Sequence, residues 1–285
     1  RDLGRYQFSG FAKLNNPFGF NESVILSAGT SNYPDSLKLA SLGYLKRLNA
    51  YGTSLSFLGS WLNDNAFKHS KTNKGSADDN KSFTSRGTVS EYLTLNNQNS
   101  FKLEAGVEYR DVENNIIGQK SIEYDYTMAF IKGKIKHIDF LNAENWFIPS
   151  YNKTINKAKI KTYETGVYQF DKDFSFINID WFRDQPLFKT NFSIYTQVMY
   201  HYTNDKLPTE HQFFIGSNSV GRGYKSGLVN ANKGSAADLE LRYTKEINNK
   251  VIEVLQPYVF GDVAHFSANT AITNNETITS TFNKK

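Results

Sequence analysis

An arginine between two glycines is the feature of this sequence best suited to specific chemistry. It stands in Gly221-Arg222-Gly223-Tyr224, after a short apolar run, Phe213–Ile215, that ends at Gly216. The glycines let the backbone approach a wall closely, and the guanidinium is a planar, permanently charged fork of donors. Such an arginine pairs best with carboxylates on a rigid scaffold. Taken alone, the tetrapeptide is more typical of an ordinary glycine turn with a solvated arginine.

The sequence contains no pattern typical of an enzyme or a metal site. The histidines have no metal-binding spacing such as HExxH, and neither GxSxG nor a phosphate-binding GxxxxGK[ST] occurs. The chain has no cysteine, which excludes disulfides and thiolate metal sites. We therefore expect no catalytic residue, no metal and no cofactor. The five histidines are His69, His137, His201, His211 and His265.

The composition favours a β protein and argues against a helical membrane protein. Of the 285 residues, 39% are hydrophobic and 15% aromatic, yet the mean hydropathy is only -0.53. No stretch approaches the roughly 18 consecutive apolar residues that a spanning helix needs. Strands of a membrane barrel alternate apolar and polar residues, and such alternation is hidden from hydropathy averages. The net charge of +5 is small and the lysines are scattered, so we expect no nucleic-acid surface.

Alternation with a period of two runs through most of the chain. In 101–110, apolar residues from Phe101 to Tyr109 alternate strictly with polar residues or glycine. A helix would need apolar spacings of three and four. The predicted strands are 5–14, 23–30, 36–45, 53–62, 83–95, 101–110, 122–130, 146–155, 157–163, 174–182, 192–202, 236–244 and 251–263, with the polar segment 63–82 as a loop.

These thirteen segments predict an all-β fold, a transmembrane antiparallel β-barrel. Most of them approach the ~10 residues that a tilted membrane strand requires, whereas sandwich strands usually have about 5–6. A soluble barrel with inverted faces is not excluded by alternation alone, but strand length and Tyr and Trp near strand ends favour the membrane. The polar alternates expected in the lumen include Glu104, Glu108, Arg110, Gln197, His201, Glu240 and Arg242.

The run from Phe192 to Tyr224 resembles the outer-membrane transporters of two-partner secretion, the haemolysin secretion/activation family. The family's Val-Arg-Gly-Tyr/Phe lid motif corresponds to 221–224, with Gly221 in place of Val. Its Phe-x-Asp-x-Gly wall motif corresponds to Phe260-Gly261-Asp262, with Ala264 in place of the last Gly. The resemblance also covers Leu207–Glu210, Phe213–Gly216, Leu239-Glu240-Leu241, Asp2-Leu3-Gly4 with Gly10, and Asn16–Gly19.

The resemblance implies that a lid loop, residues 216–233, folds back into the lumen. Arg222 would be held there by Asp262, with Glu240 as a second candidate, and Tyr224 would wedge against the wall. Without the resemblance, Asp262 is equally well explained as an ordinary lumen carboxylate, and Glu240 better so. Barrels of the family have about sixteen strands, with the lid between the eleventh and twelfth, and our count places 216–233 between the same two.

We expect residues 1–285 to be the outer-membrane barrel domain, truncated at both ends, with periplasmic POTRA domains and the last strands outside it. By this count the segments 63–82 and 156–172 lie at the end opposite the lid, where such barrels normally have short turns.

The function implied by the resemblance is an outer-membrane pore that secretes a large, unfolded exoprotein of haemolysin or adhesin type. Its partners would be that exoprotein, outer-membrane lipid and its own POTRA domains. A barrel-assembly insertase of the same superfamily is the first alternative, although Leu207–Glu210 favours secretion. A passive porin is the second, but a porin needs no lid that carries an arginine.

Overall fold

The computed structural model describes residues 6–32, 37–50, 52–65, 79–116, 119–163, 169–187, 190–216, 221–222, 229–247, 253–269 and 279–281. Nearly all of them are in strands, and the only helical element among them is a single 3-10 turn, η1 (Thr209–His211). No helix in these ranges is long and apolar enough to cross a membrane.

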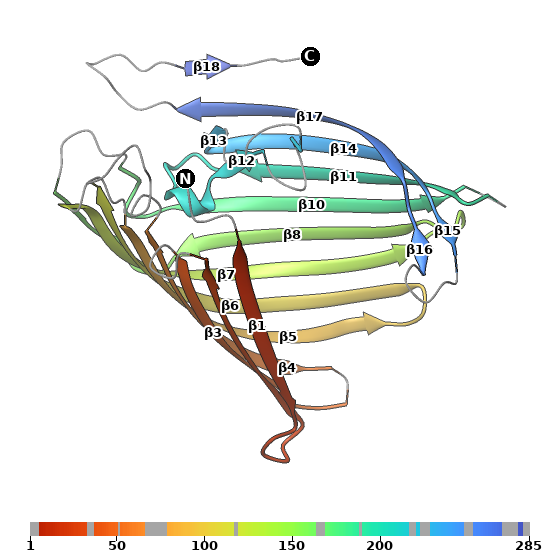
Figure 1. Ribbon diagram of the computed structural model, residues 1–285, viewed down its shortest axis with the longest axis horizontal. Coiled ribbons are helices and arrows are strands. Elements are labelled where there is room, and N and C mark those ends of the chain that lie inside the picture. The colour runs from red at the N-terminus through yellow and green to blue at the C-terminus, as the bar shows by residue number, and fades with distance from the viewer. Residues whose placement is uncertain are drawn as a thin grey trace. The chain divides into compact units, whose positions relative to one another are not determined.

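Thirteen strands follow one another in a hydrogen-bonded sheet, as Figure 1 shows by label. The order follows the sequence, with β9 and the two short hairpins off the path, and it confirms the predicted all-β antiparallel fold. The path has the predicted number of strands only because β18, which was not predicted, makes up for the predicted strand 157–163. The strands are β1 (Gln7–Asn15), β2 (Glu22–Ser31), β3 (Leu37–Arg47), β4 (Ser54–Asn65), β5 (Asp79–Leu95), β6 (Asn99–Ile116), β7 (Gln119–Ile138), β8 (Glu144–Thr154), β10 (Ser175–Pro186), β11 (Phe192–Tyr202), β14 (Lys233–Tyr243), β17 (Tyr258–Asn269) and β18 (Thr279–Thr281).

The exposure of the two sheet faces decides between a membrane barrel and a soluble one. Apolar alternates are open to the surroundings: Leu239 is 55% exposed and Val259 is 67% exposed. Polar alternates are covered instead, since Glu108 is 0% exposed and Asp238 is 2% exposed. A soluble protein would bury the first set and expose the second, so the apolar face is the one that suits lipid.

Strands β5, β6 and β7 are longer than their alternation predicts, with 17, 18 and 20 residues. Most additional residues of β5 and β6 are polar, for example Lys81, Asp111 and Glu113, whereas β7 also gains Ile131 and Ile135. The backbone ladder does not depend on side-chain polarity, so it continues where the apolar alternation has ended. For the same reason the predicted loop 63–82 is strand at both ends, in β4 and β5.

The segment predicted as a full strand at 157–163 is a short one, β9 (Lys159–Thr162), beside the path of the sheet. Directly after β8 the amide of Ile155 donates to the carbonyl of Thr127 (2.8 Å), and β9 then pairs with Ile122–Asp125 of β7. Strand β9 therefore continues the pairing with β7 beyond the point where the pairing of β8 with β7 ends. It adds no position to the strand order.

This pairing corrects the predicted place of the lid loop. The loop follows β11, the tenth strand of the path, and precedes β14, the eleventh, rather than joining the eleventh and twelfth. In an antiparallel sheet, successive connections between neighbouring strands lie at alternate ends of the sheet. The long connections after β4 and β8 and the lid connection after β11 all follow even-numbered strands of the path, so they belong to the same end. The expectation that they lie at the opposite end was wrong. Most connections of the other parity are short, but the one between β14 and β17 contains a hairpin of β15 (Lys245–Glu246) and β16 (Val254–Leu255).

One of the short turns, residues 139–143 between β7 and β8, is closed by a carboxylate. Asp139 accepts the amides of Leu141 (2.9 Å) and Ala143 (3.1 Å) and pairs with Arg183 of β10 (2.7 Å). Desolvation alone would raise the pKa of Asp139, but the bonds from Arg183 and the two amides together lower it. The charged form is therefore the one that holds this turn.

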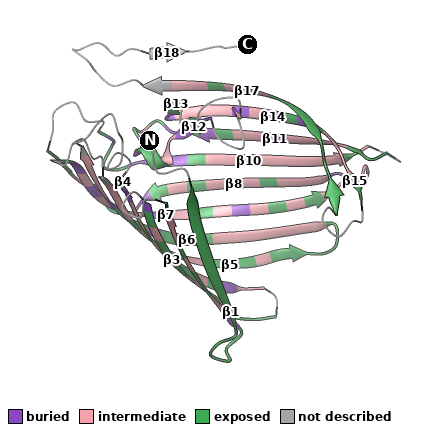
Figure 2. Ribbon diagram, viewed as in Figure 1, coloured by how far each residue is buried: buried purple, intermediate pink, exposed green. Residues whose placement is uncertain are grey.

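The described residues form two compact units, each with its own buried cluster. The first comprises residues 1–91, 104–131 and 153–173, and the second 92–103, 132–152 and 174–285. In the first unit, Tyr124, Tyr126 and Met128 of β7 are buried, and the ring of Phe170 meets Tyr124 edge-on at 4.9 Å. Figure 2 shows buried residues as short patches on strands such as β7, whereas β1 is exposed along its whole length.

Candidate functional site

The lid loop begins and ends in a small hairpin that lies against the second unit's sheet. Strand β12 (Phe213–Ile215) pairs with β13 (Val229–Ala231), and Phe213 and Ile215 are buried with Ala236 of β14. Directly beside the Phe213 ring is Gly234, where a Cβ would overlap the ring. The small residues of β14 thus make room for the hairpin. Further contacts to this cluster come from Met199 of β11 and from Ala264 and Phe266 of β17.

Polar contacts hold residues 207–212, the segment that precedes the hairpin. Leu207 is completely buried, its amide donates to Asn232 Oδ1 (3.1 Å), and Gln212 Nε2 donates to its carbonyl (3.1 Å). Gly216 and Gly221 have φ values of 94° and 74°, which only glycine adopts readily. A Cβ on Gly221 would also lie 2.6 Å from Ile215. The glycine before Arg222 is therefore required by both backbone and space.

Arg222 is held by two carboxylates of one strand. Its Nη2 contacts Asp238 Oδ1 at 2.6 Å and its Nη1 contacts Glu240 Oε1 at 2.5 Å. The three side chains are 16%, 1% and 7% exposed. Asp238 and Glu240 are two residues apart on β14, so both point to the same face and a planar guanidinium spans them.

Aromatic side chains of β17 complete the surroundings of the arginine. The guanidinium carbon of Arg222 lies 4.1 Å from the centre of the Phe260 ring and 5.7 Å from that of Tyr258. The register sets Glu240 opposite Phe260 and Asp238 opposite Asp262. We call these five residues, Asp238, Glu240, Tyr258, Phe260 and Asp262, the lid wall.

Asp262 has a different role from the one expected of it. Its Oδ2 accepts the backbone N–H of Gly221 at 2.9 Å, while the two β14 carboxylates take the guanidinium. Asp262 of β17 lies directly across from Asp238 in the register, where it meets the backbone of the lid. Asp238 was missed by sequence reasoning, although its spacing of two from Glu240 was a usable signal.

A second arginine belongs to the same network. Arg242 Nε donates to Glu240 Oε2 at 2.6 Å, its Nη1 lies 3.6 Å from Asp184, and its guanidinium carbon is 3.9 Å from the centre of the Tyr195 ring. Glu240 therefore bridges the lid arginine and a wall arginine. Burial alone would lower the pKa of Arg222, but hydrogen bonds to Glu240 and Asp238 raise it, so the lid keeps its positive charge.

Gly223 and Tyr224, the last two residues of the lid motif, lie outside the described residues. The predicted wedge role of Tyr224 stays a prediction. In the ranges that are described, no three His, Asp or Glu side chains are grouped as a metal site.

The polar face of the first unit carries a separate ion cluster. Glu108 of β6 is fully buried between Arg86 of β5 and Arg110, with Arg110 Nη2 at 3.3 Å. The Arg86 guanidinium lies 5.2 Å from the centre of the Phe130 ring. A Cβ on Gly106 would overlap both Phe130 and the backbone of β5, so glycine is needed for this packing.

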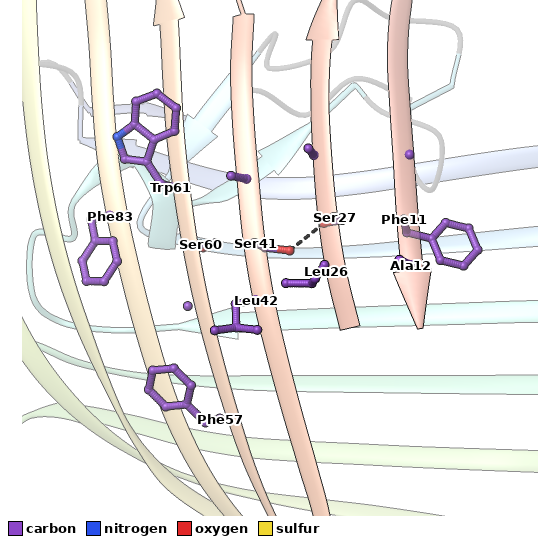
Figure 3. Close-up of a pocket in the computed structure, with 14 residues that line it drawn as sticks. Phe11, Ala12, Leu26, Ser27, Ser41, Leu42, Phe57, Ser60, Trp61 and Phe83 are labelled. Atoms are coloured by element: carbon purple, nitrogen blue, oxygen red, sulfur yellow. Dashed lines mark hydrogen bonds between the residues drawn. The ribbon is translucent and has the colours of Figure 1, made fainter. Parts of the chain in front are cut away.

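A shallow groove of about 830 Å³ crosses the apolar face of the first unit from β1 to β5. Figure 3 shows Trp61 and Phe83 on one side and Leu42 and Phe57 on the other. None of the fourteen residues that line it is charged. The groove belongs to the face that suits lipid and offers no site for chemistry.

The chain is similar to known proteins in family and in fold. The model of the family "Haemolysin secretion/activation protein ShlB/FhaC/HecB" matches residues 1–281. No curated protein matches the sequence significantly. The family is one of secretion and activation proteins, not a class of enzymes.

Three solved structures share the fold at low sequence identity. CdiB from Escherichia coli matches with a TM-score of 0.72 and 18% identity over 94% of this chain and 54% of its own. BamA from Haemophilus ducreyi gives 0.65 and 15% over 92% and 55%, and CdiB from Acinetobacter baumannii gives 0.61 and 11% over 93% and 51%. The chain thus spans about half the length of these structures. It belongs to the haemolysin secretion/activation protein family, and it is an outer-membrane β-barrel protein.

Proposed function

We propose that this chain is the transport barrel of a two-partner secretion system. Its full-length protein moves a large exoprotein of haemolysin or adhesin type, unfolded, across the outer membrane. The partners are that exoprotein, the surrounding lipid and the periplasmic POTRA domains of the same protein. The sequence has no nucleotide-binding motif, so folding of the exported chain outside the cell supplies the direction.

The observation that carries this proposal is the grip of the lid wall on Arg222. A loop held by a hydrophobic hairpin and one charged side chain can be retained at rest and displaced by a substrate. Breaking a buried ion pair costs about 3–5 kcal/mol, which retains a closed state without making it permanent. The family match over residues 1–281 supports secretion as the purpose of such a loop.

Two other functions use the same fold. An insertase for other barrel proteins is favoured by the similarity to BamA, at a TM-score of 0.65. A passive porin has no use for an arginine held by two buried carboxylates. The family match and the segment Leu207–Glu210 favour secretion over both.

An export assay in vesicles tests the proposal. The full-length protein is reconstituted with its periplasmic side outward, and the unfolded, labelled exoprotein encoded beside it is added. We expect labelled exoprotein to become protected from protease inside the vesicles, and only in vesicles that contain the barrel. If the vesicles instead accelerate folding of an unrelated barrel protein without protecting the exoprotein, the insertase is correct. Ion conductance without either activity would indicate a porin.

A further inference from the structure

We propose that the lid wall is a receptor for guanidinium groups, and that an arginine of the exported partner takes the place of Arg222 when the lid leaves. The first half concerns a binding site on this chain. The second half rests on the proposed function.

The site that holds Arg222 is formed by side chains of β14 and β17. It offers one carboxylate to each terminal nitrogen, at 2.6 Å and 2.5 Å, and an aromatic face at 4.1 Å. Two carboxylates two residues apart, with a ring alongside, match the planar fork of a guanidinium. They match an ammonium poorly, because it is a compact point charge that does not stack.

The site cannot stay empty at low cost. Asp238 is 1% exposed and Glu240 7% exposed beneath the arginine. Departure of Arg222 takes from Asp238 its ion pair, leaves Glu240 with Arg242, and leaves Asp238 across from Asp262, a second carboxylate. A cation that takes the place of Arg222 lowers the cost of the open state.

The wall's own arginine does not meet this need. Arg242 is already engaged with Glu240, Asp184 and the Tyr195 ring. Once Arg222 is gone, Arg242 stays paired with Glu240 and Asp184. Asp238 has then lost its ion pair with Arg222, and Asp262 lies across from it in the register. The vacated wall is therefore acidic and receptive to a further cation.

The partner's arginine side chains have the chemistry that this site selects. An unfolded chain that passes the wall presents its side chains one after another, and its arginines reproduce the contacts of Arg222. Each such contact offsets the cost of the open lid. Arginines of the exported chain thus hold the passage open, and the lid returns when none is in place.

The first test measures binding of methylguanidinium to the full-length Arg222→Ala protein by saturation-transfer NMR. We expect a signal at least several-fold above that of the wild type, whose site is filled, and above that of methylammonium. Addition of Asp238→Asn and Glu240→Gln should remove it. If the alanine variant loses its heat-modifiable migration, Arg222→Gln is used in its place. Equal signals for both cations, or for the carboxylate variants, overturn the receptor.

The second test uses a partner in which every arginine is replaced by lysine. We expect its export by the wild-type barrel to slow at least several-fold. Unchanged export overturns the exchange step, even where methylguanidinium binds. If neither partner is exported at all, the proposed function fails, and the NMR result stands separately as a test of the site.

Discussion

Replacing Asp238 by asparagine removes the charge of the most deeply buried partner of Arg222. The substitution keeps the size of the side chain and leaves Glu240 in place, at 2.5 Å from the guanidinium. The loss is therefore that of one charge-assisted hydrogen bond, about 1.5–3 kcal/mol. It is smaller than the ~3–5 kcal/mol of removing a whole buried partner. Since about 1.4 kcal/mol is a factor of ten, the ratio of open to closed lid should rise roughly 10- to 100-fold.

The conductance of the full-length protein in planar bilayers measures this ratio as the fraction of time in the open state. Asp184→Asn is the matched control, because Asp184 is 48% exposed and contacts Arg242, not the lid. Asp262→Asn should act less strongly than Asp238→Asn, since an amide oxygen still accepts the N–H of Gly221. The reasoning is refuted if Asp262→Asn has the larger effect, or if Asp238→Asn behaves like the control.

Three further predictions concern the supports of the fold in the full-length protein. Gly234→Val should force the ring of Phe213 from the wall, cost about 1–3 kcal/mol and raise the open fraction, whereas Gly261→Ala, with no atom within 4 Å of the new Cβ, should not. Glu108→Gln should weaken the hold on its two arginines by about 2 kcal/mol and lower the temperature at which heat-modifiable migration is lost; an unchanged temperature would contradict the buried ion cluster. The lowered pKa of Asp139 means that its stabilisation is present above the unfolded-state pKa of about 3.9 and is lost as the pH falls through the lower folded value. Asp139→Asn should therefore flatten the acid side of the stability profile, measured by thermal unfolding against pH, and an unaltered profile would count against the turn.

The strands were predictable because side chains alternate with a period of two whether the apolar face of the sheet meets lipid or a protein core. The register of β14 against β17 was not predictable, so the partners of Arg222 could not be identified from the sequence. Asp238 of β14 contacts the guanidinium of Arg222, whereas Asp262, directly across from it on β17, accepts the backbone N–H of Gly221. Sequence spacing gives the face on which a carboxylate lies but not the strand neighbour that it faces.

The small hairpin under the lid shows a second limit of sequence reasoning. The apolar run Phe213–Ile215 was recognised as a strand, but its partner β13 has only three residues and no alternation long enough to notice. The glycine at 234 is explained only by the ring of Phe213 above it, a contact between residues 21 positions apart. Short-range patterns cannot encode such packing.

Strand β9 was miscounted for a related reason. The composition of Lys159–Thr162 is compatible with a strand. It does not tell whether this strand occupies its own place in the strand order or extends the pairing of β8 with β7. Only the pairing with Ile122–Asp125 settles that question, and it moves the lid to the correct place in the strand order.

The most direct test of the account is a photo-crosslink from the lid wall to a partner stalled during export. A photoreactive amino acid replaces Phe260, whose ring lies beside Arg222, in the full-length protein. The control replaces Val259, which points to the opposite face of the same strand and is 67% exposed. The account predicts an adduct with the stalled partner at position 260 and none at 259. If the partner is exported and stalls without any adduct at 260, it does not pass the wall that Arg222 occupies, and the proposed role of the lid is wrong.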